Sequence, residues 1–361
     1  MFQSGQELTR VADLFGDPLV YIARIGGGRN SRVYKILLGT GEEFAVKQYY
    51  ADGNGECERM MREFRTLEFL WGSGIRSVPR PVKIDYKGCQ GVYEFVRGSI
   101  PNTDSLDRGD INQAVKFLIG LHRLSSASGG KEQPWASEAF VSLTTIVDGI
   151  GQRLSRLIEG SRSSSVFSEV SFFLNSVFTP VFNQIVGDVG RQVGESPEIV
   201  GGTMTLSPSD FGFHNVLRKG DGQLTFVDFE HFGYDDPVKL VADINLHPHS
   251  AMQFDDRLKR SLITSLSEYF GSFDQFFSER LSLFWPIFCL KWCMILLNEF
   301  DTEALARRKH ALAGREYFVA RAPEIQLEKA RKMLDKVEKC DSIVSSLNKK
   351  VSGFGSTFHG N

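Results

Sequence analysis

The chain has 361 residues, a formal net charge of −2, 42% hydrophobic residues and 24% charged residues. This length suits about two domains, and the apolar content is enough for a sizeable core, so the composition argues against a disordered chain. Basic residues are interleaved with acidic ones, which argues against a surface for nucleic acid or for an anionic membrane.

The remaining bulk features favour a protein of the cytoplasm. No apolar run behind a basic flank marks a signal peptide. The longest apolar run, near residues 284–297, is interrupted by Lys291, and we expect it to be too short to span a bilayer. The cysteines are scattered, so we expect reduced thiols, with Cys289 and Cys293 packed in the core rather than bound to a metal. The five are Cys57, Cys89, Cys289, Cys293 and Cys340.

The chain begins with a pattern of short strands. Residues 19–25, 33–38 and 44–50 are apolar runs separated by glycine-rich turns, which predicts an antiparallel meander. The first turn reads Gly26-x-Gly28-x-x-Ser31-x-Val33, and glycines there let backbone N–H groups approach phosphate oxygens. A dinucleotide-binding interpretation fails because a strand, not a helix, follows these glycines.

A lysine on the third strand and a glutamate on the next helix form the second candidate pair. Lys47 lies fourteen residues after Val33, in the sequence Ala-Val-Lys. Residues 56–71 are predicted to be helical, and Glu63 lies at the edge of their apolar stripe, where it can face the sheet and meet Lys47. The alternative is that Glu63 is a solvated charge. The stripe consists of Met60, Phe64, Leu67 and Trp71.

From residue 104 onward the apolar periodicity is helical. Helices are predicted near 110–124, 137–157, 257–270, 279–300, 302–320 and 323–344, and residues 187–197 are predicted to form a loop. Asp243 follows a helix start at 235–237, where it can brace the core or cap the helix toward solvent. His247-Pro-His249 places two histidines in a loop, but no third ligand at suitable spacing supports a metal site.

The centre of the sequence is the stretch from Leu206 to Glu230. Asp210 precedes Asn215 by five residues, and Asp228 follows Asn215 by thirteen. Two apolar runs joined by an Asp-Gly turn lie between Asn215 and Asp228, so a hairpin brings these two residues together. They then offer oxygen ligands to one Mg²⁺ ion, and Asp210 is free to hold a hydroxyl. This layout suits phosphoryl transfer.

The spacing resembles the catalytic loop of kinases, in which an Asp precedes an Asn by five and a metal-binding Asp-Phe-Gly follows. The last triplet here is Asp228-Phe229-Glu230, and the acid in third place resembles small-molecule kinases more than protein kinases. From about residue 20 to residue 244, the motifs resemble the aminoglycoside phosphotransferase family. A β-hairpin with acidic ends and no chemistry is the alternative.

The resemblance implies a role for each candidate residue. Asp210 would orient the acceptor hydroxyl and accept its proton, with Asn215 and Asp228 holding Mg²⁺. Lys47, steadied by Glu63, would hold the ATP phosphates. The phosphates would be covered by the loop with Gly26, Gly28, Ser31 and Val33, adenine would meet the main chain at Glu94 and Val96, and the acids Glu230 and Glu299 are weaker candidates for binding the acceptor.

One departure bears on turnover. The family usually has a His two residues before the catalytic Asp, where it braces the loop, and this chain has Pro208. A nucleotide-binding regulatory protein that transfers nothing is therefore the main alternative. A protein side chain as the acceptor is a second alternative, and the lack of an Ala-Pro-Glu segment counts against it.

The prediction is an α+β chain with a bilobal protein-kinase-like fold. Residues 1–97 would form a small antiparallel-sheet N-lobe with one helix, residues 98–350 a larger helical C-lobe, and residues 351–361 a flexible tail. The predicted function is ATP- and Mg²⁺-dependent phosphorylation of a hydroxyl on a small molecule, such as an aminoglycoside, a sugar or an amino alcohol. We expect no nucleic-acid or membrane partner, and the sequence does not reveal the oligomeric state.

Overall fold

The chain divides into two compact units, each described below by itself. Unit 1 consists of Met1–Pro101, Asn215–Phe232 and Glu303–Phe318. Unit 2 consists of Asn102–His214, Gly233–Thr302 and Val319–Asn361. The computed structural model describes residues 10–11, 13–26, 31–51, 57–127, 129–160, 166–196, 201–312 and 322–337.

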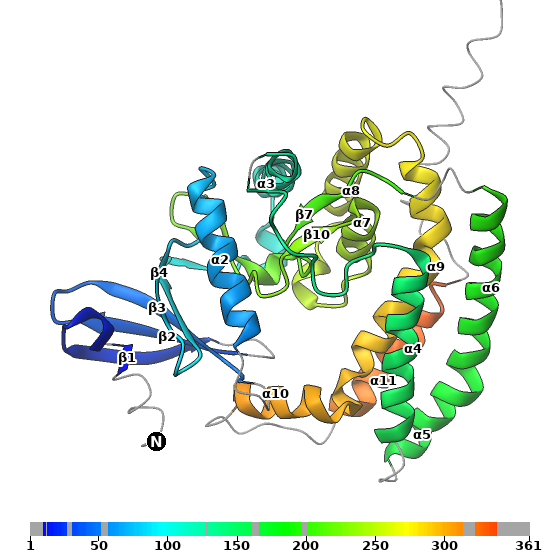
Figure 1. The fold of residues 1–361 in the computed structure, drawn as a ribbon, viewed down its shortest axis with the longest axis horizontal. Coiled ribbons are helices and arrows are strands. Elements are labelled where there is room, and N and C mark those ends of the chain that lie inside the picture. Colours follow the sequence, from blue (N-terminus) through cyan, green and yellow to red (C-terminus); the bar gives the residue numbers. More distant parts are fainter. Residues whose placement is uncertain are drawn as a thin grey trace, which may run out of the picture. The chain divides into compact units, whose positions relative to one another are not determined.

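A five-stranded antiparallel sheet forms the centre of unit 1, as the apolar runs predict (Figure 1). Side chains of β2 alternate between buried and half-buried, and Tyr34, Ile36 and Leu38 face the core with Phe44 and Val46 of β3. In sheet order, the strands are β1 (Leu19–Gly26), β2 (Ser31–Leu38), β3 (Glu43–Tyr49), β5 (Gln90–Glu94) and β4 (Pro81–Asp85).

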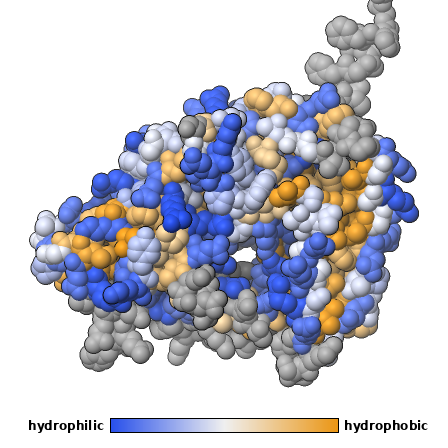
Figure 2. Space-filling view, in the orientation of Figure 1, coloured by the Kyte–Doolittle hydropathy of each residue, from blue (hydrophilic) through white to orange (hydrophobic). Residues whose placement is uncertain are grey.

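The edge strand of this sheet carries exposed apolar side chains. Figure 2 shows apolar atoms on the surface of unit 1. Four of its large exposed hydrophobic residues lie on β1, namely Val20, Tyr21, Ile22 and Ile25. Among the described residues, β1 pairs with β2 alone, so fewer neighbours cover this strand than cover the strands inside the sheet.

Helix α2 (Glu58–Gly72) packs against β4 and β5 of the same sheet (Figure 1). The predicted stripe is its buried face: Met60, Phe64 and Leu67 are buried. Trp71 is half-buried and its indole N–H donates to the carbonyl of Val78 at 3.2 Å. The helix is therefore held by the apolar periodicity from which it was predicted.

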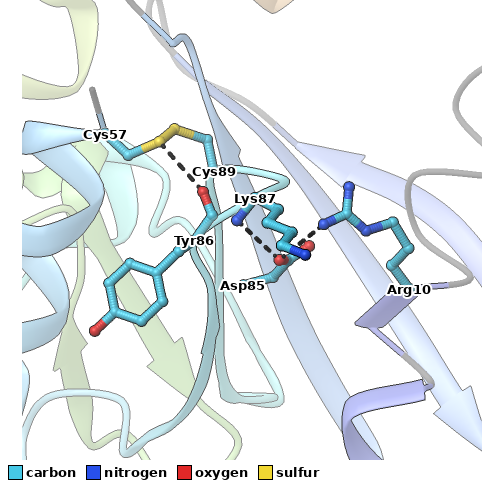
Figure 3. The surroundings of a disulfide bond; sticks show 6 residues. All are labelled: Arg10, Cys57, Asp85, Tyr86, Lys87 and Cys89. Carbon is cyan, nitrogen blue, oxygen red and sulfur yellow. Dashed lines mark hydrogen bonds and ion pairs between the residues drawn. A yellow bond between two sulfur atoms is a disulfide. The ribbon is translucent and has the colours of Figure 1, made fainter. Parts of the chain in front are cut away.

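A disulfide bond ties the start of α2 to the turn between β4 and β5 (Figure 3). It joins Cys57, the N-cap of α2, to Cys89, with a Cα–Cα distance of 5.6 Å. The expectation that these two thiols are reduced was wrong, because the fold brings together cysteines that lie 32 residues apart. Cys289 and Cys293 are not disulfide-bonded and are buried, which confirms their predicted place in the core.

The predicted hairpin after Asn215 is confirmed. Strand β8 pairs with β9 and, on its other side, with β6, so these three strands form a second sheet in unit 1. The amide of Phe226 donates to the carbonyl of Ser77 at 2.8 Å, which anchors the hairpin to the rest of the unit. The strands are β6 (Gly98–Ser99), β8 (Val216–Lys219) and β9 (Leu224–Phe226), and α10 (Thr302–Leu312) follows later in the chain.

Unit 2 is mainly helical. Helix α7 is buried along its whole length and contacts α8 and α9. The helices are α3 (Arg108–Ser125), α4 (Leu143–Gly160), α5 (Val166–Phe172), the π-helical η3 (Phe173–Phe178), α6 (Thr179–Glu195), α7 (Pro237–Leu246), α8 (Asp256–Gly271), α9 (Phe277–Leu296) and α11 (Ala322–Leu334). Shorter elements are η1 (Thr103–Ser105), β7 (Thr205–Ser207), η5 (Phe213–Asn215), β10 (Gly233–Asp235), η6 (Ser250–Met252) and η7 (Leu297–Phe300).

Two predictions about these helices were wrong. A loop was predicted for residues 187–197, but α6 continues through residues 187–195. Apolar residues at 185, 189 and 193 keep a helical period, and α6 packs against α9, so packing outweighs the helix-breaking tendency of glycine. The apolar helix was expected to be too short for a bilayer. It extends over Phe277–Phe300 with a mean hydropathy of 1.6, so by length and composition it could cross a membrane. Of the most apolar part of this helix, 72% is buried within the protein, as in the core helix of a folded unit.

Candidate active site

Lys47 is the centre of an ion network in unit 1. Its strand, β3, pairs with β2 at Val33 and with β5 at Gly91, so the lysine lies inside the sheet. The ammonium lies 2.6 Å from Glu63 Oε2, 2.6 Å from Asp228 Oδ1 and 3.4 Å from Glu230 Oε2. Only 7% of Lys47 is exposed, so these carboxylates replace water as the partners of its charge.

The structure places Glu63 as the sequence predicts. It is buried on α2, while Glu58 and Glu68 of the same helix are exposed. Besides the Lys47 ammonium, its carboxylate accepts the hydroxyl of Tyr49 at 2.6 Å. The two donors fix the carboxylate, so Glu63 holds Lys47 rather than acting as a solvated charge.

Asp228 follows β9 with a left-handed backbone, at a φ of 70°. A non-glycine residue there is strained, and such strain is typical of functional loops. Burial raises the pKa of the Asp228 carboxyl and Lys47 lowers it, while Glu230 and Glu63 raise it further, which gives a pKa of about 6. The three acids therefore compete for one ammonium.

Glu230 lies in the same network rather than apart from it. It is 3% exposed, and Arg59 of α2 donates to its carboxylate at 2.7 Å. Burial alone would raise the pKa of Glu230, but Lys47, His231 and Arg59 hold it well below its usual range. This position favours a role in holding cations over one in binding the acceptor. Sequence reasoning missed Arg59, although it lies one helical turn before Glu63.

The network also explains the charge on Lys47. Burial would lower the pKa of its ammonium, but attraction to Asp228, Glu63 and Glu230 outweighs this effect and raises the pKa well above its usual value. Lys47 is therefore a permanent cation in a site with little water. Such a cation suits the recognition of phosphate groups.

The donor chemistry at the hairpin ends fits a hard cation. The amide of Val227 donates to the carbonyl of Asn215 at 3.0 Å, so the hairpin brings the backbone of Asn215 next to that of Asp228. An amide oxygen and a carboxylate are ligands that Mg²⁺ accepts, with phosphate and water completing its shell. The chain passes from unit 2 to unit 1 between His214 and Asn215.

The remaining candidates in unit 1 lie near the same sheet. Gly26 pairs with Val33, and Ser31 begins β2, is buried and pairs with Tyr49. Gly28 lies outside the described residues. Glu94 ends β5, and its side chain accepts the amide of Arg80 at 3.2 Å, while Val96 is buried two residues later. Glu94 and Val96 thus lie at and just after the end of β5, and their main-chain role toward adenine stays a prediction.

Asp210 lies in unit 2, on the loop after β7. Ser209 has a left-handed backbone, at a φ of 65°. Its amide donates to Ser207 Oγ at 3.0 Å, and its hydroxyl donates to the carbonyl of Ser137 at 3.1 Å. These bonds hold the turn that presents Asp210. Pro208, two residues before Asp210, has no side-chain donor.

Two histidines contact the Asp210 carboxylate. His247 Nε2 lies 3.0 Å from Asp210 Oδ1, and His214 Nε2 lies 3.6 Å from the same oxygen. Burial would raise the pKa of Asp210, but the hydrogen bonds from both histidines hold it well below its usual range. The Asp210 side chain is 40% exposed, so solvent reaches part of the ionised carboxylate.

These histidines were missed as partners of Asp210. His214 lies four residues after Asp210, a spacing that carried no signal because the loop is not a regular helix. His247 was weighed only for metal binding. Glu299 is 8% exposed in η7 of unit 2, beside Asn298, which accepts from Arg153 of α4 at 2.6 Å. Its acceptor-binding role stays a prediction.

Comparison with known proteins agrees with the motifs. Residues 22–143 match the family described as the phosphotransferase enzyme family, the aminoglycoside phosphotransferase group. The resemblance predicted from the motifs is thus confirmed, although this match ends before the stretch from Asp210 to Asp228. No curated protein matches the chain in sequence.

Solved structures of small-molecule kinases share the fold. An ethanolamine kinase from Plasmodium vivax is 12% identical with a TM-score of 0.57, and covers 95% of this chain and 86% of its own. A choline kinase from Streptococcus pneumoniae is 12% identical with a TM-score of 0.56, at 93% and 100% coverage. A spectinomycin phosphotransferase, solved with ADP and spectinomycin, is 15% identical with a TM-score of 0.54, at 96% and 98% coverage. The predicted α+β kinase-like fold is confirmed.

Proposed function

Taking that family likeness as the premise, we propose that this phosphotransferase moves the γ-phosphate of Mg-ATP to a hydroxyl group of a small molecule. The observation that carries the proposal is the buried contact of Lys47 with both Glu63 and Asp228. A strand lysine paired with a helix glutamate and with the acid after the hairpin is the arrangement that kinases use to hold phosphates and metal.

ATP would be held by unit 1. Lys47 is the cation for the phosphates, and Glu63 fixes the direction in which it points. The turn from Gly26 to Ser31 would cover the phosphates with backbone N–H groups. The main chain at Glu94 and Val96 would hydrogen-bond adenine, which explains why side chains at these two positions need no special chemistry.

Mg²⁺ would be held by Asn215 and Asp228. When bound, the ion neutralises charge on the transferring phosphate. Lys47 already shares the Asp228 carboxylate and offsets part of the repulsion among the three acids of the network. The amide of Asn215 adds an oxygen ligand without adding a further charge.

Asp210 would orient the acceptor hydroxyl. Because its pKa is held well below the usual range, it is a weak base toward a neutral alcohol. In a loose transition state the hydroxyl becomes acidic late, so a positioned carboxylate with a low pKa can hold the O–H first and take its proton as the bond to phosphorus forms. Orientation is therefore its main contribution.

The acceptor is proposed to be an amino alcohol, an amino sugar or another sugar. The similar solved structures are named for ethanolamine, choline and spectinomycin, each a small molecule with a hydroxyl group. Glu230 is engaged by Arg59 and Lys47, which leaves Glu299 as the remaining predicted acid for a cationic acceptor.

A nucleotide-binding protein that transfers nothing is the second candidate, and Pro208 is the observation that favours it. The experiment is transfer of ³²P from the γ-position of Mg-ATP into a small-molecule cell extract, with wild type beside Asp210→Asn. We expect a labelled metabolite only with wild type. ATP binding without label in any fraction would favour the second candidate, and label on protein would favour a protein acceptor.

A further inference from the structure

Three histidine rings pack together in unit 2, and two of them contact Asp210. The ring of His214 lies 4.6 Å from that of His247 and 4.5 Å from that of His249, between centroids. The sequence motifs give none of them a role in phosphoryl transfer. The Asp210 carboxylate meets two of them, so their contacts decide how that carboxylate is oriented.

His247 is held from several sides. Its backbone amide donates to the carbonyl of Asp243 at 2.9 Å, which makes it the C-cap of α7. Its ring packs edge-on against Trp292 of α9, with centroids 4.8 Å apart, and the indole N–H of Trp292 donates to Asp243 Oδ1 at 2.8 Å. Because α7 and α9 fix the ring, its nitrogens have defined partners.

The hydrogen bonds of His247 select one tautomer. The backbone N–H of His249 lies 3.2 Å from His247 Nδ1 and donates to it. Nδ1 must therefore carry a lone pair, and a neutral imidazole must carry its proton on Nε2. Nε2 lies 3.0 Å from Asp210 Oδ1, so His247 donates to the carboxylate.

A metal site at the same residues is the competing explanation. One ligand atom each from Asp210, His214 and His247 lies within 4.8 Å of the others, a spacing open to a divalent transition metal. A histidine that binds metal through Nε2 carries its proton on Nδ1. That proton would point at the N–H of His249, so the backbone opposes the metal-binding tautomer and favours the donor.

We infer that His247 is a positioning residue for phosphoryl transfer, which holds Oδ1 of Asp210 and so fixes the orientation of the carboxylate toward the acceptor hydroxyl. The inference rests on the proposed function. Pro208 offers no side-chain donor to the loop, and His247 supplies one from the end of α7.

The charges that face His247 keep the ring neutral. Burial lowers its pKa, the Asp210 carboxylate partly offsets this, His214 lowers it further, and Asp243 raises it slightly. Neutral His247 keeps the Nε2–H bond at pH 7. Protonation of His247 would add a proton to Nδ1, which would then face the backbone N–H of His249. The contact of His247 with Asp210 in this geometry should therefore weaken only in acid.

The test combines long-range ¹H–¹⁵N NMR of the histidines in the full chain with kinetics of three variants. We expect the His247 signal, assigned through its loss in His247→Gln, to show the Nε2–H tautomer at pH 7.5. His247→Leu removes the donor, whereas His247→Gln keeps an amide N–H near the position of Nε2. The control is His122→Leu, which removes a buried histidine of α3 that contacts Tyr269 at 3.0 Å.

With Mg-ATP and the acceptor recovered from the labelled extract, we expect kcat to fall about 10- to 100-fold in His247→Leu, the order of loss expected from misplacing a reacting group. KM for ATP should stay within about twofold, because unit 1 holds the nucleotide, and His247→Gln should recover most of kcat. The low-pH limb of kcat should move to higher pH in His247→Leu, because the carboxylate loses a donor.

The outcomes separate the two claims. The Nδ1–H tautomer in an active wild type, or unchanged kcat in His247→Leu, overturns the inference and leaves the proposed function standing. Equal losses in His247→Leu, His247→Gln and His122→Leu also overturn it, because that pattern reports general damage. Failure of wild type to transfer phosphate to any acceptor overturns the proposed function and, with it, the catalytic claim for His247.

Discussion

Replacement of Lys47 by Met tests whether the ion network in unit 1 depends on a single cation. The variant keeps the length of the buried stem and removes the charge that three carboxylates share. Removing one partner of a buried pair costs about 3–5 kcal/mol, because the charge left behind is not solvated. Arg59 also contacts Glu230, so the uncompensated acids are chiefly Glu63 and Asp228.

Lys35→Met is the matched control. Lys35 lies on the neighbouring strand and pairs with Glu43 at 2.5 Å, but the two side chains are 22% and 20% exposed. An ion pair open to water contributes about 1 kcal/mol or less. Both variants lose one lysine from the same sheet, so the difference between them reports burial of the network rather than the loss of a positive charge.

The assay is native-state hydrogen exchange of amides in β3 and α2, because it measures the free energy of opening of unit 1 alone. We expect Lys47→Met to lower this free energy by about 3–5 kcal/mol. Asp228 has a pKa of about 6, above its usual 3.8, so the folded chain binds more protons than the unfolded chain and gains stability as the pH falls from about 6 to 4. Because Lys47 lowers the pKa of Asp228, Lys47→Met should raise that pKa above 6, and the penalty of the variant should shrink as the pH falls toward 6. Equal effects of the two variants at pH 7 would refute the reasoning.

Three further changes test other parts of the structure. A Cβ at Gly212 would lie 2.5 Å from His214 Nδ1, so Gly212→Ala should lower the unfolding free energy by about 1–3 kcal/mol in urea, while Gly220→Ala, with open space around it, should not. Cys89→Ser removes a crosslink between residues 32 positions apart and should lower the free energy of unfolding by about 4 kcal/mol. Wild type should show the same loss after reduction by a dithiol. An unchanged urea midpoint would contradict this prediction. Arg59→Ala leaves buried Glu230 with one donor fewer and should lower the free energy of unfolding by about 1–3 kcal/mol. Arg65→Ala, at an exposed position of α2, should not lower it.

Local patterns were enough to predict the parts of the fold that position the site. The alternation in β2 and the stripe on α2 each bury one face, and the exposed Asp-Gly turn reverses the chain between β8 and β9, so each local pattern determines its own element. The position of Glu63 at the edge of the stripe was enough to predict its contact with Lys47, and the hairpin was enough to predict that Asn215 and Asp228 are neighbours. The contact of Asp228 with Lys47, 181 residues away in sequence, was not predicted.

The parts that were missed depend on contacts between distant segments. Nothing in the spacing of Cys57 and Cys89 indicates a bond, since it follows from the packing of α2 on β5. His247 reaches Asp210 only because α7 ends there, 37 residues later. The helix at residues 187–195 needed α9 as a packing partner. Tertiary packing decided all three.

The central claim is that an alcohol oxygen accepts the γ-phosphate of ATP. The most direct measurement is ³¹P NMR of Mg-ATP with the purified chain and the small-molecule extract. We predict that the γ-phosphate signal decays and that a phosphomonoester signal appears, split by protons on the carbon next to the ester oxygen, with Asp210→Asn showing neither change. Formation of inorganic phosphate alone, or no loss of the γ-signal while ATP binds, would contradict the account.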